Sequence, residues 1–134
     1  MKKHVGHCLI CGRELDDGVT WLYFAERFPK VICTRCEQRF ELCNAQGKAE
    51  ASNESTKLSE HIALYNYNEA MKDYLHRYKF MKDVVLAKVF RKELNACLRR
   101  LNGLVVPIPL HEEKLQERTF AQVDELLNEA TIPY

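Results

Sequence analysis

Two cysteine pairs near the N-terminus constrain the fold more than any other feature of the sequence. Cys8 and Cys11 form one C-x-x-C pair, Cys33 and Cys36 form a second, and 21 residues separate the two pairs. Two such turns can direct four thiolates at one point, which suits the tetrahedral coordination that Zn²⁺ prefers. Glycine follows the first pair at Gly12, where the turn often requires a positive φ angle. The spacing therefore predicts a structural zinc ion bound by all four cysteines.

The alternatives to a zinc site are a pair of disulfides or a redox-active C-x-x-C motif. The N-terminus shows no secretory segment, and no thioredoxin-like βαβ pattern surrounds either pair. No apolar run approaches the roughly 18 residues that a membrane-spanning helix needs. The sequence therefore predicts a cytoplasmic protein with reduced thiols and no membrane partner.

The charge is balanced over the whole chain but uneven along it. Twenty basic residues stand against 19 acidic ones, so the composition gives no strong signal for nucleic-acid binding. Residues 72–100 hold nine Lys or Arg and three acids, whereas residues 111–130 hold two basic and six acidic residues. This asymmetry fits two solvated helix faces that pair with each other, and it also fits a phosphate-facing surface in the middle segment.

The local patterns predict a small ribbon followed by a linker. Residues 19–24 read as a strand and residues 30–32 lead back to the second cysteine pair, which makes residues 1–43 a zinc ribbon. A short helix is expected over residues 37–42. Residues 44–60 are polar and nearly free of large apolar side chains, so they are expected to form a linker.

The remaining residues, 61–134, alternate between strand and helix patterns. Residues 61–67 read as a strand, Asn68 can cap a helix that starts at Glu69, and a second helix should continue to about Leu101. The apolar run 104–110 reads as a strand from the centre of a sheet, and residues 120–130 read as a helix. This order predicts an α/β fold, of which two strands form only the beginning.

The chain resembles the ComF family of competence-associated proteins, and within it the ComFC group. The resemblance is carried by several stretches in the expected order: residues 8–36, 63–73, 77–80, 86–90 and 106–110, followed by Lys114, Glu117, Arg118, Phe120 and Gln122. It implies the incomplete N-terminal half of a type I phosphoribosyltransferase-like domain. Such domains bind 5-phosphoribosyl-1-pyrophosphate (PRPP) with Mg²⁺ beyond the carboxyl ends of their strands.

The resemblance also implies which cations would face the phosphates. Lys114 and Arg118 follow the predicted strand 104–110 and are the first candidates, with Arg77 and Lys79 next. Each has a simpler alternative. Lys114 and Arg118 can pair with neighbouring glutamates, and Arg77 and Lys79 can serve the C-terminal dipole of the first helix.

Three departures from the family pattern bear on activity. The family's Arg-Gly-Phe-Asn-Gln reads Arg-Thr-Phe-Ala-Gln at residues 118–122, and Cys43 with Gln46 resembles the remnant of an eroded second ribbon. The family's Asp-Asp-x-x-Thr-Thr-Gly-x-Thr loop has no counterpart in strand–loop–helix context among the 134 residues. The resemblance therefore predicts a chain truncated before the PRPP-binding loop, with PRPP and Mg²⁺ bound only by a full-length relative.

The leading hypothesis is an inactive, truncated ComFC-like protein linked to DNA uptake in natural competence. A second hypothesis is that the zinc ribbon docks onto a DNA-translocating competence helicase, and a third is a nonfunctional gene fragment. Unpaired strands would in addition favour self-association.

Overall fold

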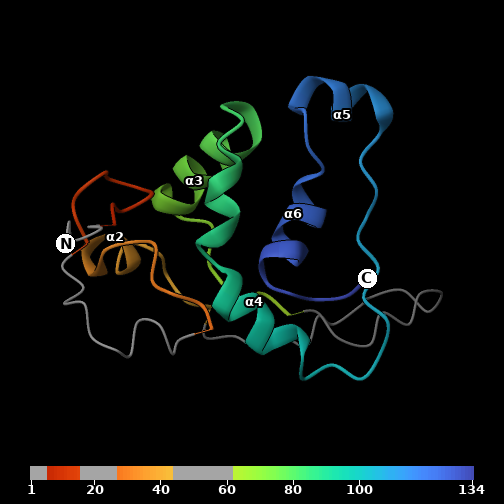
Figure 1. Cartoon of the computed structure of the whole chain (residues 1–134), viewed down its shortest axis with the longest axis horizontal. Coiled ribbons are helices and arrows are strands. Elements are labelled where there is room, and N and C mark those ends of the chain that lie inside the picture. The colour runs from red at the N-terminus through yellow and green to blue at the C-terminus, as the bar shows by residue number, and fades with distance from the viewer. Residues whose placement is uncertain (1–5, 16–26, 44–61) are drawn as a thin grey trace, which may run out of the picture.

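The computed structural model describes residues 6–15, 27–43 and 62–134, and helices are the only regular elements within these ranges (Figure 1). They are α2 (Thr34–Glu37), α3 (Glu69–Phe80), the 3₁₀ helix η1 (Val84–Lys88), α4 (Arg91–Leu98), α5 (Glu112–Arg118) and α6 (Gln122–Glu129). Helices α3 and η1 lie between the cysteine-bearing segments on one side and α6 on the other (Figure 1).

Helix α3 is the element that the sequence predicts best. Asn68 caps it, since the Asn68 side chain accepts a 3.0 Å hydrogen bond from the backbone N–H of Met71. The apolar face contains Tyr74 and Tyr78, which are buried. The helix ends at Phe80.

The predicted second helix is wrong in its extent, because the segment divides into η1 and α4. Val84 and Val85 are β-branched residues with low helix propensity, while the next residue, Leu86, is fully buried. A tight 3₁₀ turn places Leu86 in the core before the α-helical register starts at Arg91. Helix α4 ends at Leu98, three residues before the predicted end.

The expected α/β fold is not seen in the described part of the chain, where neither predicted strand forms. Within residues 62–67 there is one isolated antiparallel bridge, between Tyr65 and Leu42. Residues 104–110 run as an extended trace from α4 to α5 with no ladder partner (Figure 1). A strand requires a neighbouring strand to satisfy its backbone, and the described residues supply none for this segment. A phosphoribosyltransferase-like sheet is therefore not shown.

Of three other local predictions, one is wrong in position and two lie outside the described residues. The short helix predicted over residues 37–42 is wrong in position, because α2 occupies Thr34–Glu37 and its first turn carries the second cysteine pair. The strand predicted over residues 19–24 and the linker over residues 44–60 lie outside the described residues.

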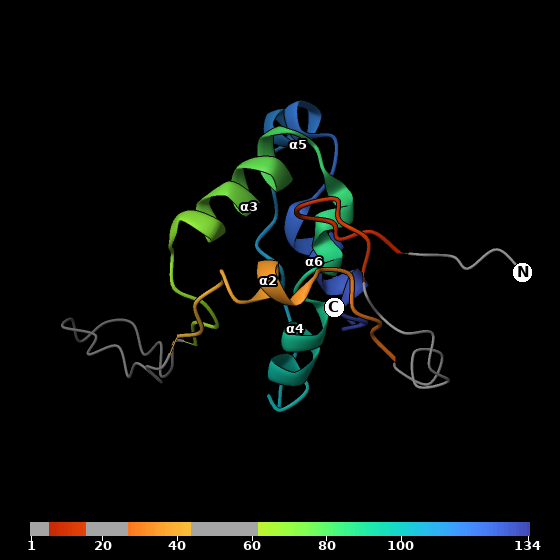
Figure 2. The same cartoon turned by 90° about the vertical axis from the view of Figure 1, so that its left-hand side faces the viewer.

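The core joins the cysteine-bearing segments to α3 and η1. Its buried aromatic residues pack at close range: Phe40 lies edge-on to Phe90 with ring centroids 5.0 Å apart, and Tyr74 lies 4.9 Å from the same ring. Tyr78 is the most deeply buried of the aromatic residues, at 1% exposed. This cluster includes Cys8 and Cys36 and therefore fixes the position of the cysteines relative to the helices. Figure 2 views the backbone from the side on which α2 lies.

Candidate metal centre

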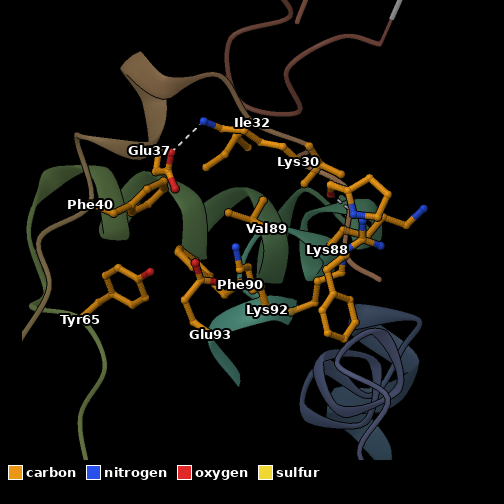
Figure 3. Close-up of a pocket in the computed structure, with 14 residues that line it drawn as sticks. Lys30, Ile32, Glu37, Phe40, Tyr65, Lys88, Val89, Phe90, Lys92 and Glu93 are labelled. Carbon is orange, nitrogen blue, oxygen red and sulfur yellow. Dashed lines mark hydrogen bonds and ion pairs between the residues drawn. The ribbon is translucent and has the colours of Figure 1, made fainter. Parts of the chain in front are cut away.

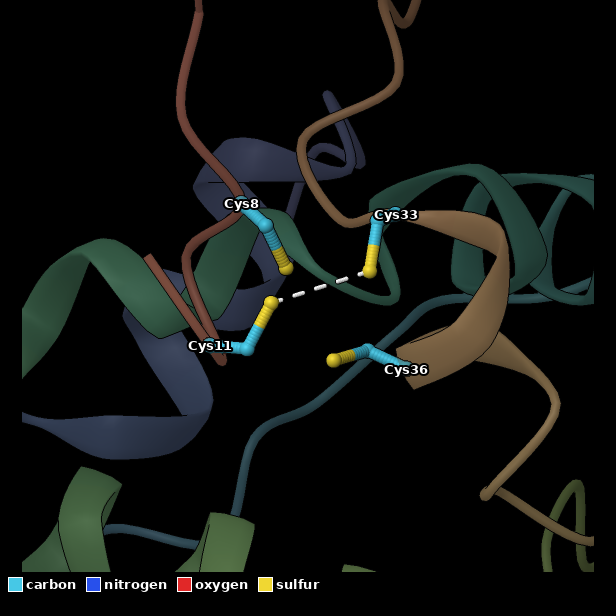
Figure 4. A group of neighbouring side chains, drawn as sticks. All are labelled: Cys8, Cys11, Cys33 and Cys36. Carbon is cyan, nitrogen blue, oxygen red and sulfur yellow. Dashed lines mark hydrogen bonds between the residues drawn. The ribbon is translucent and has the colours of Figure 1, made fainter. Parts of the chain in front are cut away.

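The four cysteine sulfur atoms all lie within 4.8 Å of one another (Figure 4). The Sγ atoms of Cys11 and Cys33 are 3.7 Å apart, and all four thiols are free. A disulfide would place two sulfurs about 2 Å apart. A tetrahedral ion with metal–sulfur bonds of about 2.3 Å places its sulfurs about 3.8 Å apart. The arrangement therefore suits four ligands to one metal ion and does not suit two disulfides.

The first cysteine pair sits in a tight turn, hereafter the first knuckle (residues 8–13). The backbone N–H of Gly12 donates to the carbonyl of Cys8 at 2.9 Å, and the N–H of Cys8 donates to the carbonyl of Arg13 at 2.7 Å. Gly12 has a φ of +74°, a conformation that other residues adopt only with strain. The prediction of a positive φ at this glycine is confirmed.

The second cysteine pair sits at the start of α2, hereafter the second knuckle (residues 33–37). The N–H of Glu37 donates to the carbonyl of Cys33 at 3.0 Å. The two knuckles are joined directly, because the N–H of Leu9 donates to the carbonyl of Val31 at 2.9 Å. Hydrogen bonds within and between the knuckles thus hold the four thiols together.

The four thiols differ in how deeply they are buried. Cys8 and Cys36 are 3% and 4% exposed and belong to the core, whereas Cys11 is exposed. Burial raises the pKa of Cys36, and hydrogen bonds with the neighbouring thiols raise it further. Burial also opposes ionisation of Cys8, but backbone hydrogen bonds from Cys11 and Cys33 outweigh it and lower the pKa. A divalent cation would favour the thiolate form of all four.

Arg77 contacts the first knuckle from α3. Its guanidinium donates to the carbonyls of Ile10 at 3.0 Å and Leu9 at 3.1 Å, and it pairs with the carboxylate of Asp83 at 2.8 Å. Sequence reasoning assigned Arg77 to phosphate and missed this contact, for which the sequence carries no signal. The position of Arg77 is that of an outer residue that supports the metal ligands.

The other three predicted phosphate contacts lie away from the cysteines. Lys114 is exposed and pairs with Glu117 at 2.8 Å, which is the simpler alternative considered from the sequence. The guanidinium of Arg118 lies 5.9 Å from the ring centroid of Phe80, the residue that follows Lys79 at the end of α3. The structure thus brings Arg118 to the end of α3, and a shared phosphate site for these cations stays a prediction.

Two further sites were missed by sequence reasoning. Gln122 is buried beside Arg118, whose Nη1 donates to Gln122 Oε1 at 2.6 Å. A pocket also lies between the second knuckle and α4, and it contains Glu93. The pocket depends on side chains from segments far apart in the sequence, so periodicity and spacing could not have found it. Arg118 and Gln122 are only four residues apart, but they lie on different helices, α5 and α6, and their contact depends on the turn between them.

Fold and site together define a class: a protein that is helical in its described residues and has two C-x-x-C knuckles that can bind one metal ion. The chain is 30% identical over 144 residues to Competence protein ComFC of Streptococcus pneumoniae, covering 95% of the chain and 66% of that protein. It is 24% identical over 139 residues to Competence protein ComFC of Bacillus subtilis, covering 86% of the chain and 58% of that protein. The chain is therefore a ComFC-like competence protein.

The chain spans less than two thirds of the length of both relatives. No family profile matches it, and no solved structure matches it. Within the described residues, no helix has both the length and the apolar character needed to cross a membrane.

Proposed function

We propose that this chain acts in DNA uptake during natural competence and that its cysteine centre holds a structural Zn²⁺ ion. The sulfur geometry carries this proposal. Four thiolates at tetrahedral spacing are the donor set and arrangement that select zinc or an iron–sulfur centre, and a single ion fits the observed distances. Four protein ligands leave no open position for substrate, so the ion's role is to hold the knuckles. The resemblance to ComFC supplies the link to competence.

The surface organised by the zinc is proposed to dock onto a DNA-translocating competence helicase in the cytoplasm. The exposed residues Cys11 to Glu14, at the end of the first knuckle and just beyond it, are available for this. Arg13 and Glu14 are exposed charges on the arm that leaves the turn, so a partner can contact them without disturbing the core.

Docking can be tested with the full, zinc-loaded chain and the purified helicase of the same organism. The paired substitutions R13E and E14R reverse both charges with no change in net charge, and we expect them to weaken binding at least about tenfold. The control is Glu113→Arg on α5, an exposed residue away from the knuckles, which should leave binding unchanged. Equal binding by all three proteins would count against docking through the knuckle.

A second candidate function is phosphate binding at Arg118, supported by donors that lack partners. Within the part of the chain that the structure describes, Arg118 Nε and Gln122 Nε2 are buried and have no hydrogen-bond partner. A buried N–H group without an acceptor is unfavourable, and a phosphate oxygen could accept a hydrogen bond from both Arg118 Nε and Gln122 Nε2. Lys114, one helical turn earlier, would add charge from the surface. We propose that Arg118 and Lys114 contact phosphate, with Lys79 nearby and Arg77 in a supporting role.

This chain alone is proposed not to transfer phosphoribosyl groups. Its residues include no counterpart of the family's Asp-Asp-x-x-Thr-Thr-Gly-x-Thr loop in strand–loop–helix context, and that loop would hold the ribose phosphate of PRPP with Mg²⁺ nearby. Calorimetric titration with PRPP and Mg²⁺ should therefore show no binding tighter than millimolar. Pyrophosphate should still shift the Arg118 Nε–H resonance in an NMR titration. PRPP binding tighter than millimolar would contradict the proposed lack of phosphoribosyl transfer. No shift at Arg118 would contradict the proposed phosphate contact.

A further inference from the structure

A cavity of about 240 Å³ lies between the second knuckle and the η1–α4 segment (Figure 3). Buried apolar side chains from both segments line it: Ile32 and Phe40 from the knuckle side, and Val89 and Phe90 from the helix side. Neither the metal centre nor the proposed phosphate contacts include any of these residues. The cavity is therefore a separate feature of the fold.

Three aromatic rings line one end of the cavity. Tyr65 lies 4.8 Å from Phe90 between ring centroids, at an interplanar angle of 45°, and Phe40 is edge-on to Phe90 at 5.0 Å. Tyr65 is only half-buried, so part of its ring surface is open to a ligand. Aromatic walls of this kind suit a planar ring that can stack or pack edge-to-face.

The charged residues of the cavity leave two cations unpaired. Lys30 pairs with Glu37 at 2.9 Å, and Arg91 donates to a backbone carbonyl at 2.8 Å and lies 3.6 Å from Glu129. Among the described residues, Lys88 and Lys92 have no acidic or hydrogen-bonding partner. The cavity therefore presents two positive charges to an anion.

One carboxylate oxygen in the cavity lacks a donor. Glu93 Oε2 is buried and has no hydrogen-bond partner among the residues that the structure describes. The side chain lines the cavity beside Phe90 and near Tyr65 (Figure 3). Burial, together with the charges of Glu93 and then Glu37, raises the pKa of Tyr65 to about 12, which agrees with this placement. A buried acceptor without a donor is costly, so a ligand N–H group would stabilise it.

We propose that this cavity binds one nucleotide. Its base packs against Tyr65 and Phe90, an N–H group on the edge of the base donates to Glu93 Oε2, and its phosphate contacts Lys88 and Lys92. The residues that line the cavity favour a small ligand with three properties: a planar ring, an N–H donor and a negative charge. The nucleotide can be free or can be one unit of a single strand, since both present the same groups. This inference does not rest on the proposed competence function or on the helicase.

The test uses the zinc-loaded full chain and isothermal titration with deoxycytidine monophosphate, a short oligodeoxycytidine, and ribose 5-phosphate as the ligand without a base. The first two should bind, and ribose 5-phosphate should bind roughly tenfold more weakly because it lacks the stacked base. Comparable affinities for the monophosphate and the oligonucleotide would identify a free nucleotide as the source. Much tighter binding of the oligonucleotide would identify a single strand.

Two variants connect the binding to the cavity. K88A/K92A should weaken binding of the monophosphate at least roughly tenfold, because two charge-assisted contacts are lost. The matched control R99A/R100A removes the same two charges just beyond α4, outside the cavity, and should leave binding of the monophosphate within about twofold. Glu93→Gln should reduce the preference for the monophosphate over ribose 5-phosphate.

Three results would overturn the proposal. These are no binding of either nucleotide ligand, equal weakening by the two double variants, or ribose 5-phosphate binding as tightly as the monophosphate. Circular dichroism of each variant, with unchanged helix content, ensures that a loss of binding is not a loss of fold.

Discussion

The guanidinium of Arg77 donates a 3.0 Å hydrogen bond to the carbonyl oxygen of Ile10, 67 positions earlier in the chain. Ile10 lies between the first two cysteines, so this bond ties the first knuckle to α3. The carboxylate of Asp83 pairs with the same guanidinium at 2.8 Å. The metal centre is thus connected to the helical core through a side chain that binds no metal, and this connection can be tested.

Arg77→Lys should destabilise the zinc-loaded protein by about 2 kcal/mol in the free energy of unfolding. Lysine keeps the positive charge but lacks the planar guanidinium that reaches two carbonyls and a carboxylate, so at least one partly buried acceptor loses its donor. Urea denaturation measures the loss, and competition with a zinc chelator should show faster release of metal.

The control for Arg77 is Arg39→Lys. Arg39 is exposed and lies 3.9 Å from Asp73, with both side chains more than half exposed. Such surface pairs contribute little, so this variant should change stability by less than about 0.5 kcal/mol. Equal effects of the two substitutions would show that Arg77 does not support the knuckle.

Removal of the metal should unfold the knuckles and loosen the core beneath them. Cys8 and Cys36 belong to the same buried cluster as Phe40 and Tyr74, so losing the ion disturbs more than the ligands. We expect a chelator to lower the melting temperature by roughly 10 °C or more. Bound metal holds the thiols deprotonated below their usual pKa, so its stabilisation is present at neutral pH and is lost as pH falls. An unchanged melting curve after complete metal removal would contradict this.

The clustering of the four cysteines was predictable because its signal is local. A C-x-x-C pair is a spacing within four residues. Helix α3 is likewise marked by local signals, a cap at Asn68 and a 3.6-residue apolar period, so the cysteine cluster and this helix were both predicted. The strands were not predictable in the same way. Residues 104–110 have the composition of a strand, but strand formation depends on a partner that the period of one segment cannot reveal.

Tyr78→Phe should cost about 1–2 kcal/mol in the free energy of unfolding. The Tyr78 hydroxyl donates to the backbone carbonyl of Gln122 at 2.7 Å in a buried position, and phenylalanine would leave that carbonyl unsatisfied. Tyr67→Phe is the matched control, since Tyr67 is 72% exposed and should change stability by less than about 0.5 kcal/mol. Thermal and urea unfolding measure both.

The raised pKa of Tyr78 predicts that the free energy of unfolding depends on pH. Burial raises the pKa of Tyr78 above its ordinary value near 10, and the charges of Glu125 and Glu129 raise it further. The folded state therefore retains a proton that the unfolded chain releases. This stabilisation is complete below about pH 10 and is lost as pH rises above that value. Tyr78→Phe should reduce the alkaline loss of stability, and an identical alkaline transition in the variant would contradict the assignment.

Exposed apolar side chains in residues 104–110 predict self-association. Leu104 and Ile108 are 84% and 86% exposed, and the segment has no ladder partner among residues 6–15, 27–43 and 62–134, so its backbone can pair with a second chain. The double variant L104S/I108K should leave unfolding stability within about 0.5 kcal/mol, because the side chains contribute little to the core. Sedimentation velocity over a concentration series should show association in the parent chain and less in the variant. A parent chain that stays monomeric would refute this.

The site residues around Arg118 show where sequence reasoning reached only part of the answer. The resemblance pointed to Arg118, but its partner Gln122 and its contact with Phe80 depend on how α3, α5 and α6 meet. The replacement of the family's glycine by Thr119 suggested an altered loop. The structure gives Thr119 a φ of +70° as the C-cap of α5, so this chain adopts the left-handed conformation here without a glycine.

Thr119→Gly should therefore stabilise the protein by about 1 kcal/mol. A β-branched residue in the left-handed region is strained, and glycine relieves the strain without losing a contact, because Thr119 is exposed and its N–H bond to Leu115 at 2.7 Å is a backbone bond. The control is Thr131→Gly, at a φ of +56°. The Thr131 hydroxyl accepts a 2.7 Å hydrogen bond from Arg27, so this variant relieves the same strain but loses a contact. Urea denaturation should show a gain for the first variant and a smaller gain or a loss for the second. A loss of stability in Thr119→Gly would show that the threonine side chain stabilises the end of α5 in a way that the backbone conformation does not predict.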